Sequence, residues 1–160
     1  MAKLELQKTQ VGIEGLAPIM FDRFIDHSAE QRPTDQKMYL EGDNELMLPA
    51  ENIYAFLFGA NTPGCAKLFE GKKGKLYINT GQAHLFVEPV MIPFKKNGKV
   101  IKFAGFDGKT FWEFKQSACT KKGSLVIKQE VRPRPVLNLP WSLEFTITLL
   151  SNDLIDMNKL

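Results

Sequence analysis

The sequence predicts an α+β fold, a ferredoxin-like or split-β antiparallel sheet with helices on one face. Residues 46–58 read as the end of a strand, a proline step and a helix with apolar residues spaced three and four apart. Residues 143–149 alternate between apolar and polar, which is typical of a half-buried strand. Asn97-Gly98 marks a tight hairpin turn between two further strands.

The first half of the chain contains a strand, a polar loop and the helices. Residues 4–14 predict a strand with a bulge near Thr9, because its apolar residues change parity there. Residues 26–44 predict a long surface loop, with a short strand at 38–40. The main helix begins at Ala50, and a second short helix is expected at 65–70.

From Lys75 onward the sequence predicts mostly strands, and we expect one domain over 1–160. The strands are expected at 75–79, 82–94, 100–103, 111–114, 125–131 and 143–149. Ser151 or Asn152 would cap a last helix, which the sequence cuts short after about two turns, at Leu160.

Composition is that of a globular protein of one domain. The chain has 160 residues, of which 44% are apolar and 24% charged. Cys65 and Cys119 have no partner at the spacing of a zinc site or a disulfide framework, so we expect reduced thiols. The sequence contains neither a signal-peptide pattern nor an apolar run of membrane-spanning length. We therefore expect a cytoplasmic protein without membrane contact.

The net charge of +3 is unevenly distributed along the chain. Residues 1–70 hold 6 Lys and Arg against 11 Asp and Glu, whereas residues 71–160 hold 15 against 7. An acidic front and a basic back favour either binding of a polyanion or head-to-tail contacts between copies. The third interpretation is a mixed, solvated surface.

The sequence gives little support to catalysis. His27 and His84 are the only histidines, and neither is tied by spacing to a nucleophile or a carboxylate. Glu51 and Asp22 could act as acid or base, but no second acidic residue or histidine accompanies either. Motifs for phosphate, dinucleotide or metal binding are absent, so we expect a non-enzyme with no cofactor and no metal.

Basic residues gather at the predicted turns and beside aromatic residues. These candidate nucleic-acid contacts are Lys72, Lys73, Lys75, Lys95, Lys96, Lys121, Lys122, Arg132, Arg134, Phe111 and Trp112. Lysines at turns would contact phosphates without reading bases, and aromatic rings offer stacking planes. In the competing interpretation the lysines solubilise turns or follow a helix C-terminus, and the rings belong to the core. Prolines 133 and 135 keep the two arginines on an extended segment.

Two short segments carry a family resemblance. Residues 13–20 and 48–57 resemble the start of the RNA-binding backbone subunits of CRISPR effector complexes, where a strand ends at a proline and leads into a helix. Residues 131–135 and 141–145 are similar to a family of uncharacterised phage and prophage proteins that share this opening. The resemblance implies a ferredoxin-like fold and RNA binding and, if the protein is phage-encoded, a location in the host cytoplasm. Acidic Glu51 stands where those subunits carry small and basic residues, so Arg132 and Arg134 are expected to make the main contacts.

Two functions follow from these observations. The first is a non-catalytic, phage-type protein that binds single-stranded DNA or RNA, multimeric along the strand. The alternative is a phage structural or interaction module in which the acidic front of one copy meets the basic back of the next. Both predict a homo-oligomer.

Overall fold

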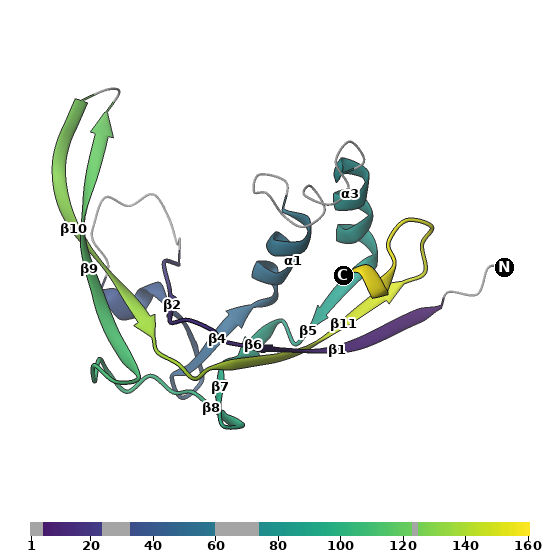
Figure 1. The fold of residues 1–160 in the computed structure, drawn as a ribbon, viewed down its shortest axis with the longest axis horizontal. Coiled ribbons are helices and arrows are strands. Elements are labelled where there is room, and N and C mark those ends of the chain that lie inside the picture. The colour runs from purple at the N-terminus through teal and green to yellow at the C-terminus, as the bar shows by residue number, and fades with distance from the viewer. Residues whose placement is uncertain (1–4, 24–32, 60–73, 123–124) are drawn as a thin grey trace. The chain divides into compact units, whose positions relative to one another are not determined.

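The protein has an α+β fold with mostly antiparallel sheets in the computed structural model (Figure 1). The structure describes residues 5–23, 33–59, 74–122 and 125–160, with the backbone alone for 116–122 and 125–132 and for residue 159. The chain forms two compact units. Unit 1 comprises Met1–Ile13, Leu48–Pro93 and Leu143–Leu160, and unit 2 comprises Glu14–Met47 and Phe94–Ser142. The specific ferredoxin-like layout and the single domain stay predictions.

Unit 1 is built on a sheet with β11 (Ser142–Leu150) at its centre. Its neighbours are β1 (Leu6–Glu14) and β5 (Leu85–Glu88), and β6 (Met91–Pro93) follows β5 along the chain. Odd-numbered residues of β11 from 143 to 149 are all buried, which confirms the strand predicted from their alternation. The exposed fraction of Leu6 is 59%, so this even-numbered residue of β1 is not part of the core. The bulge expected near Thr9 is therefore not needed to bury even-numbered and odd-numbered apolar residues together.

Two helices complete unit 1, α1 (Ala50–Phe58) and α3 (Gly74–His84). Helix α1 confirms the helix predicted from Ala50. Its residue Tyr54 links it to β5, because the phenol donates to Leu85 O at 3.0 Å and accepts from Val87 N at 2.8 Å. The strand predicted at 75–79 is wrong, because this segment is the first half of α3. Ile78 and Gly81, three residues apart, are buried on one side of the helix, so packing overrides the β propensity of the segment.

Two further predictions on polar segments need correction. Part of the loop predicted at 26–44 has regular structure, with a 3₁₀ helix at Thr34–Lys37 and buried Met38, and the short strand predicted at 38–40 is confirmed as β3 at Tyr39–Glu41. Buried Met38 anchors this segment, which explains the structure within a polar stretch. The helix predicted after Ser151 is instead a turn followed by a 3₁₀ helix at Met157–Lys159. Residues 24–32 of the loop and the helix predicted at 65–70 lie outside the described residues.

Unit 2 contains the other strands. They are β2 (Ile19–Met20), β3, most of β4 (Glu45–Pro49), β7 (Lys95–Lys96), β8 (Lys99–Val100), β9 (Phe111–Lys122) and β10 (Leu125–Leu137). β10 lies between β2 and β9, and β3 pairs with β4. β7 and β8 form the predicted hairpin, in which Asn97 and Gly98 have φ of 52° and 76°, the left-handed pair that a tight turn requires.

Aromatic side chains form the core of unit 2. Phe94 makes edge-to-face contacts with Phe21 and Trp141, at ring-centroid distances of 5.6 and 5.7 Å. Phe111 is 2% exposed, and its ring lies 5.2 Å from that of Phe103. Because Phe111 is the first residue of β9, this cluster anchors the base of the β9–β10 hairpin.

Candidate nucleic-acid interface

The β9–β10 hairpin is the longest antiparallel pair of the described chain. Its register runs from Phe111 opposite Leu137 to Lys122 opposite Leu125, with one irregularity between Val126 and Lys128. β2 and the 3₁₀ helix at Thr34–Lys37 both contact β10. A two-stranded ribbon that emerges from a packed base exposes two faces, and its residues alternate between them.

The register assigns basic and aromatic positions to the same face of this ribbon. Arg134 is opposite Phe114, and position 132 is opposite position 116, so both arginines belong to one alternation. Position 128 pairs with position 120. Because even-numbered positions of β9 share one face, positions 120 and 122 belong to the same alternation as position 116. We call this set the ribbon face, and its basic and aromatic positions are Trp112, Phe114, Lys122, Lys128, Arg132 and Arg134.

The described end of the ribbon face has a defined geometry. Trp112 and Phe114 are both half-buried, and their rings meet edge to face with centroids 6.0 Å apart. The indole of Trp112 donates to Asn138 Oδ1 at 3.0 Å, and the Asn138 amide donates to Lys109 O at 2.8 Å. These bonds hold the indole in one orientation on the strand.

Arg134 is bound to a carboxylate in the free protein. Its Nε donates to Asp22 Oδ2 at 2.7 Å, with side-chain exposures of 24% for the arginine and 53% for the aspartate. Asp22 is placed by the segment after β2, where Phe21 N donates to Pro135 O at 2.9 Å. A surface pair of this kind contributes little to stability, so its main consequence is to position the guanidinium and neutralise it.

The opposite face of the ribbon is fastened to the 3₁₀ helix. Thr34 Oγ1 donates to Glu113 Oε1 at 2.6 Å, and Lys37 Nζ donates to Pro133 O at 2.5 Å. The Thr34 hydrogen bond, followed by that from Lys115, holds the pKa of the Glu113 carboxyl below its usual value. Glu113 and Lys115 also form an ion pair at 3.2 Å, so the described charges of this face are paired, as Arg134 and Asp22 are on the ribbon face.

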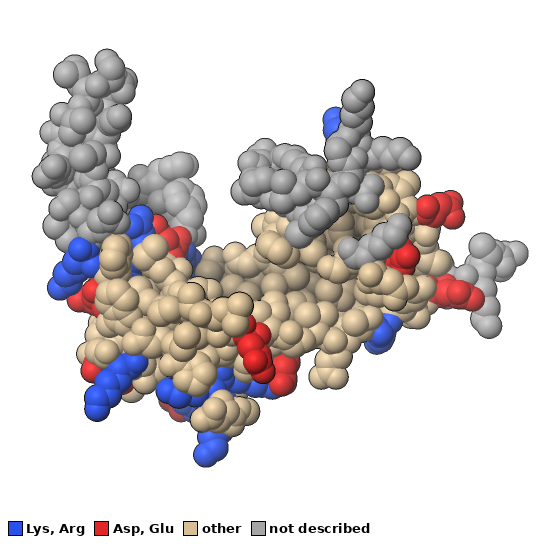
Figure 2. Space-filling view, in the orientation of Figure 1, with Lys and Arg blue, Asp and Glu red and all other residues tan. Residues whose placement is uncertain are grey.

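A second group of cations lies on the β7–β8 hairpin. Lys96 and Lys99 are exposed and directly opposite each other, an arrangement that like charges disfavour. In Figure 2, Lys and Arg gather over the elements of unit 2, around this hairpin and beside the lower part of β9–β10. Lys95 is half-buried at the start of the hairpin, opposite Val100.

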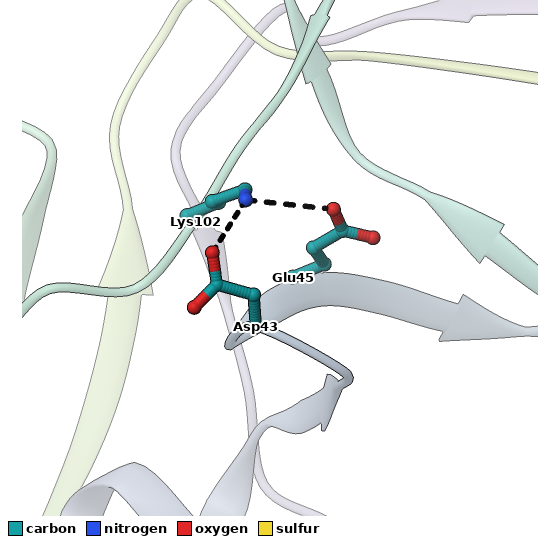
Figure 3. Close-up of polar contacts among 3 residues, drawn as sticks. All are labelled: Asp43, Glu45 and Lys102. Carbon is teal, nitrogen blue, oxygen red and sulfur yellow. Dashed lines mark hydrogen bonds and ion pairs between the residues drawn. The ribbon is translucent and has the colours of Figure 1, made fainter.

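Lys102 is held by two acidic residues from the front half of the chain. Its Nζ lies 2.7 Å from Asp43 Oδ2 and 3.8 Å from Glu45 Oε1 (Figure 3). The hydrogen bond with Lys102 lowers the pKa of Asp43, and the same bond raises the pKa of Lys102. Like the Arg134–Asp22 pair, this cluster joins acids before residue 71 to a base after it. The charge asymmetry of the sequence is therefore partly compensated within unit 2. The sequence of this unit contains 14 basic and 11 acidic residues.

Several predicted site residues do not belong to the ribbon face. Phe111 is buried in the core, which corrects its assignment as a stacking plane. Lys75, a predicted nucleic-acid contact that the competing interpretation places beyond a helix C-terminus, occupies the first turn of α3, where the helix dipole disfavours a cation. Position 121 falls on the opposite alternation from 122. Lys72 and Lys73 lie outside the described residues.

Two positions of the ribbon face were missed from the sequence. Phe114 is two residues after Trp112 on β9, and Lys128 is four residues before Arg132 on β10, so each lies on the same face as its partner. Counting every second residue along the two strands would have found both. The irregularity after Val126 changes which residues of β10, even-numbered or odd-numbered, lie on the ribbon face. The register was therefore needed to show which positions of the two strands share a face.

Other kinds of site are not seen in the parts of the chain that the structure describes. These parts contain no group of three or more His, Cys, Asp and Glu that could hold a metal ion. His84 lies at the end of α3, rather than in the strand predicted for it, and its Nδ1 is 3.0 Å from Thr80 O. His27 lies outside the described residues. Among the described helices, none has the length and apolar content that crossing a membrane demands.

The chain was compared with family models, with curated proteins and with solved structures, and none of the three comparisons gave a match.

Proposed function

We propose that the protein binds single-stranded nucleic acid through the ribbon face of β9–β10, without catalysis. The observation that carries the proposal is the register, which assigns four basic positions, two aromatic positions and one acidic position, Glu130, to one face. Lysine and arginine would contact phosphates, and Trp112 and Phe114 would stack on bases. This combination gives sequence-tolerant binding that weakens with salt.

The single-stranded form is favoured by the placement of the rings. Trp112 and Phe114 are adjacent on the face and opposite Val136 and Arg134, so a base stacked on either ring would have its phosphate near a guanidinium. Bases in a duplex are already stacked on each other and are less available to aromatic side chains. Lys96 and Lys99 offer a second set of phosphate contacts on the same unit.

RNA is the proposed ligand in preference to DNA. The resemblance of residues 13–20 and 48–57 to RNA-binding backbone subunits supports this choice, as it supports a phage origin and a ferredoxin-like layout for unit 1. Multimers would then form along the strand, where neighbouring copies occupy successive sites. In this proposal the cytoplasm is the place of action.

The binding test uses labelled 12-nucleotide single strands of RNA and DNA and a duplex of the same length, with fluorescence anisotropy as the readout. We expect the RNA strand to bind more tightly than the duplex, and Arg134→Ala to weaken binding about 3-fold to 10-fold. Lys75→Ala is the matched control, since it removes one charge from unit 1 and should change the affinity less than 2-fold. Equal loss in both variants, or no binding at low salt, contradicts the proposal.

A second readout tests the stacking role of Trp112. The chain has two tryptophans, Trp112 and Trp141, so a Trp141→Phe protein reports Trp112 fluorescence alone. Binding of the RNA strand should quench this fluorescence, and unchanged emission in the bound state would exclude stacking. Trp112→Phe should retain most of the affinity, whereas Trp112→Ala should lose about 1–3 kcal/mol of binding free energy.

A further inference from the structure

Unit 1 contains a cavity beside the beginning of α1. Its volume is about 490 Å³, within the usual range for small-molecule sites. α1 contributes Ala50, Glu51 and Tyr54, and the sheet and the turn after β5 contribute the remaining walls. None of the residues of the ribbon face lines this cavity, so its role is separate from the proposed nucleic-acid binding.

The rim of the cavity is unusually apolar for an exposed surface. Leu6, Phe86 and Val90 line it, and their exposed fractions are 59%, 46% and 66%. Single exposed apolar residues are common, but three around one hollow are typical of a binding site. An apolar body placed here would cover side chains that otherwise face water.

One wall of the cavity carries a polar group without a partner. Thr148 is 7% exposed, and its hydroxyl has no hydrogen-bond partner among the described residues. The hydroxyl oxygen exposes less than 1 Å², and Phe86 stands opposite Thr148 in the β11–β5 register. A turn of the exposed Phe86 ring would open the hydroxyl to an occupant of the cavity. Buried polar groups are normally paired, so this one points to a missing partner.

The charged residues of the cavity favour a cation. Glu51 and Glu88 line it together with a single lysine, Lys8, which leaves one negative charge in excess. None of the three forms an ion pair with a described residue. A ligand with an ammonium group would pair with the carboxylates while its apolar part covers the rim.

We propose that this cavity binds a small organic cation with an aromatic or aliphatic body, such as an arylalkylammonium ion. The ammonium group lies between the Glu51 and Glu88 carboxylates and donates to the Thr148 hydroxyl. The body of the ligand packs on Leu6, Phe86 and Val90.

Three compounds with one indole ring and one chain length test the proposal. Tryptamine is cationic, tryptophol is neutral and indole-3-propionate is anionic, and each is titrated into the full chain with ¹H–¹⁵N correlation spectra as the readout. We expect tryptamine alone to shift the amide signals of residues 50–54, 86–90 and 148 in a saturable way. Equal or tighter binding of tryptophol or indole-3-propionate, or no saturable shift with tryptamine, overturns the proposal.

Variants separate binding from folding. Thr148→Val should lower the affinity for tryptamine about 3-fold to 10-fold without lowering the melting temperature, because the hydroxyl that it removes has no partner in the free protein. Thr146→Val is the control on the same strand, since Thr146 does not line the cavity, and it should leave the affinity unchanged. Glu51→Gln and Glu88→Gln should each weaken binding, whereas Asp153→Asn, elsewhere in unit 1, should not. Equal effects of Thr148→Val and Thr146→Val would overturn the role of the hydroxyl.

Discussion

At the scale of single residues, Asp107 shows how one side chain organises a loop. Its Oδ1 accepts from the backbone N–H groups of Lys109, Thr110 and Phe111, at 2.9, 2.7 and 2.9 Å. The hydrogen bonds from Phe111 and Lys109 are the main reason that the pKa of Asp107 is lowered to about 2. The loop thereby delivers Phe111 to the core and starts β9 in a fixed register.

We predict that Asp107→Ala destabilises the protein in a pH-dependent way. Because the pKa is lowered from 3.8 to about 2 on folding, the stabilisation by Asp107 is complete above pH 3.8 and is lost as the pH falls towards 2. Thermal unfolding of both proteins, followed by circular dichroism between pH 7 and pH 2, measures the difference. The melting temperatures should differ at neutral pH and converge at low pH, and a constant difference would contradict the assignment.

Gly81 shows that contact geometry outweighs helix propensity in α3. A Cβ at this position would lie 2.5 Å from atoms of the Phe58 ring, so glycine is what lets α1 and α3 approach. Helix propensity alone would make Gly81→Ala stabilising by about 1 kcal/mol.

We predict that Gly81→Ala instead lowers the free energy of unfolding by about 1–3 kcal/mol. Urea denaturation measures this value. Asn79→Ala is the control, because Asn79 is exposed on the same helix and its replacement should stabilise slightly. A stabilised Gly81→Ala protein would show that the Phe58 ring moves aside without cost. Combining Gly81→Ala with Phe58→Leu should recover part of the loss.

At the scale of elements, the ribbon depends on contacts that are remote in sequence. Asp22 and Arg134 are 112 residues apart, and Thr34 and Glu113 are 79 apart. The sequence predicted the turn at Asn97, the helix from Ala50 and the last strand, because each follows from a local pattern. The helical state of 75–84 was missed, since it depends on the contact between Gly81 and Phe58.

The same limit applies to the candidate site. Arg132, Arg134 and Trp112 were selected from local composition, and the register then placed them in one alternation. Burial of Phe111 agrees with the competing interpretation, which assigned the rings to the core, but local composition could not decide between that interpretation and a stacking plane. The bond between Asp22 and Arg134 joins two halves that sequence reasoning assigned to opposite charge blocks.

Asp22 is predicted to limit nucleic-acid binding by the ribbon. Asp22→Asn removes a negative charge and releases the Arg134 guanidinium, so the affinity for a 12-nucleotide RNA strand should rise about 2-fold to 5-fold at low salt. Anisotropy titrations measure the change. Asp35→Asn is the matched control on the same unit, and its effect should be smaller. An equal increase in both variants would mean that net charge alone, rather than release of Arg134, controls the affinity.

At the scale of the whole molecule, some charges of the acidic front of the sequence are paired with charges of its basic back. Lys102 binds Asp43 and Glu45, and Arg134 binds Asp22, so acids of the front half neutralise bases of the back half inside unit 2. The three acids and two bases paired in this way are less available for contacts between copies.

We predict that salt does not change the assembly state of the free protein. Sedimentation velocity at about 50 and about 500 mM salt should give the same coefficient, because acids and bases that could attract neighbouring copies are already paired within unit 2. Only assembly through exposed charges would respond to the stronger screening at high salt. Bound RNA provides the contrast, since assembly along a strand should raise the coefficient. A larger species of the free protein that dissociates at high salt would instead support the interaction module.

The salt dependence of RNA binding tests the central claim most directly. In a plot of log K against log salt concentration for a single strand, the four cations on the ribbon face alone contribute a slope of about −3, and contacts from Lys96 and Lys99 would make it steeper. Replacing Arg132 and Arg134 together by alanine should reduce the size of the slope by about 1.4 and leave the fold intact by circular dichroism. A slope that is unchanged in this double variant, or an affinity that does not depend on salt, would contradict binding through the ribbon face.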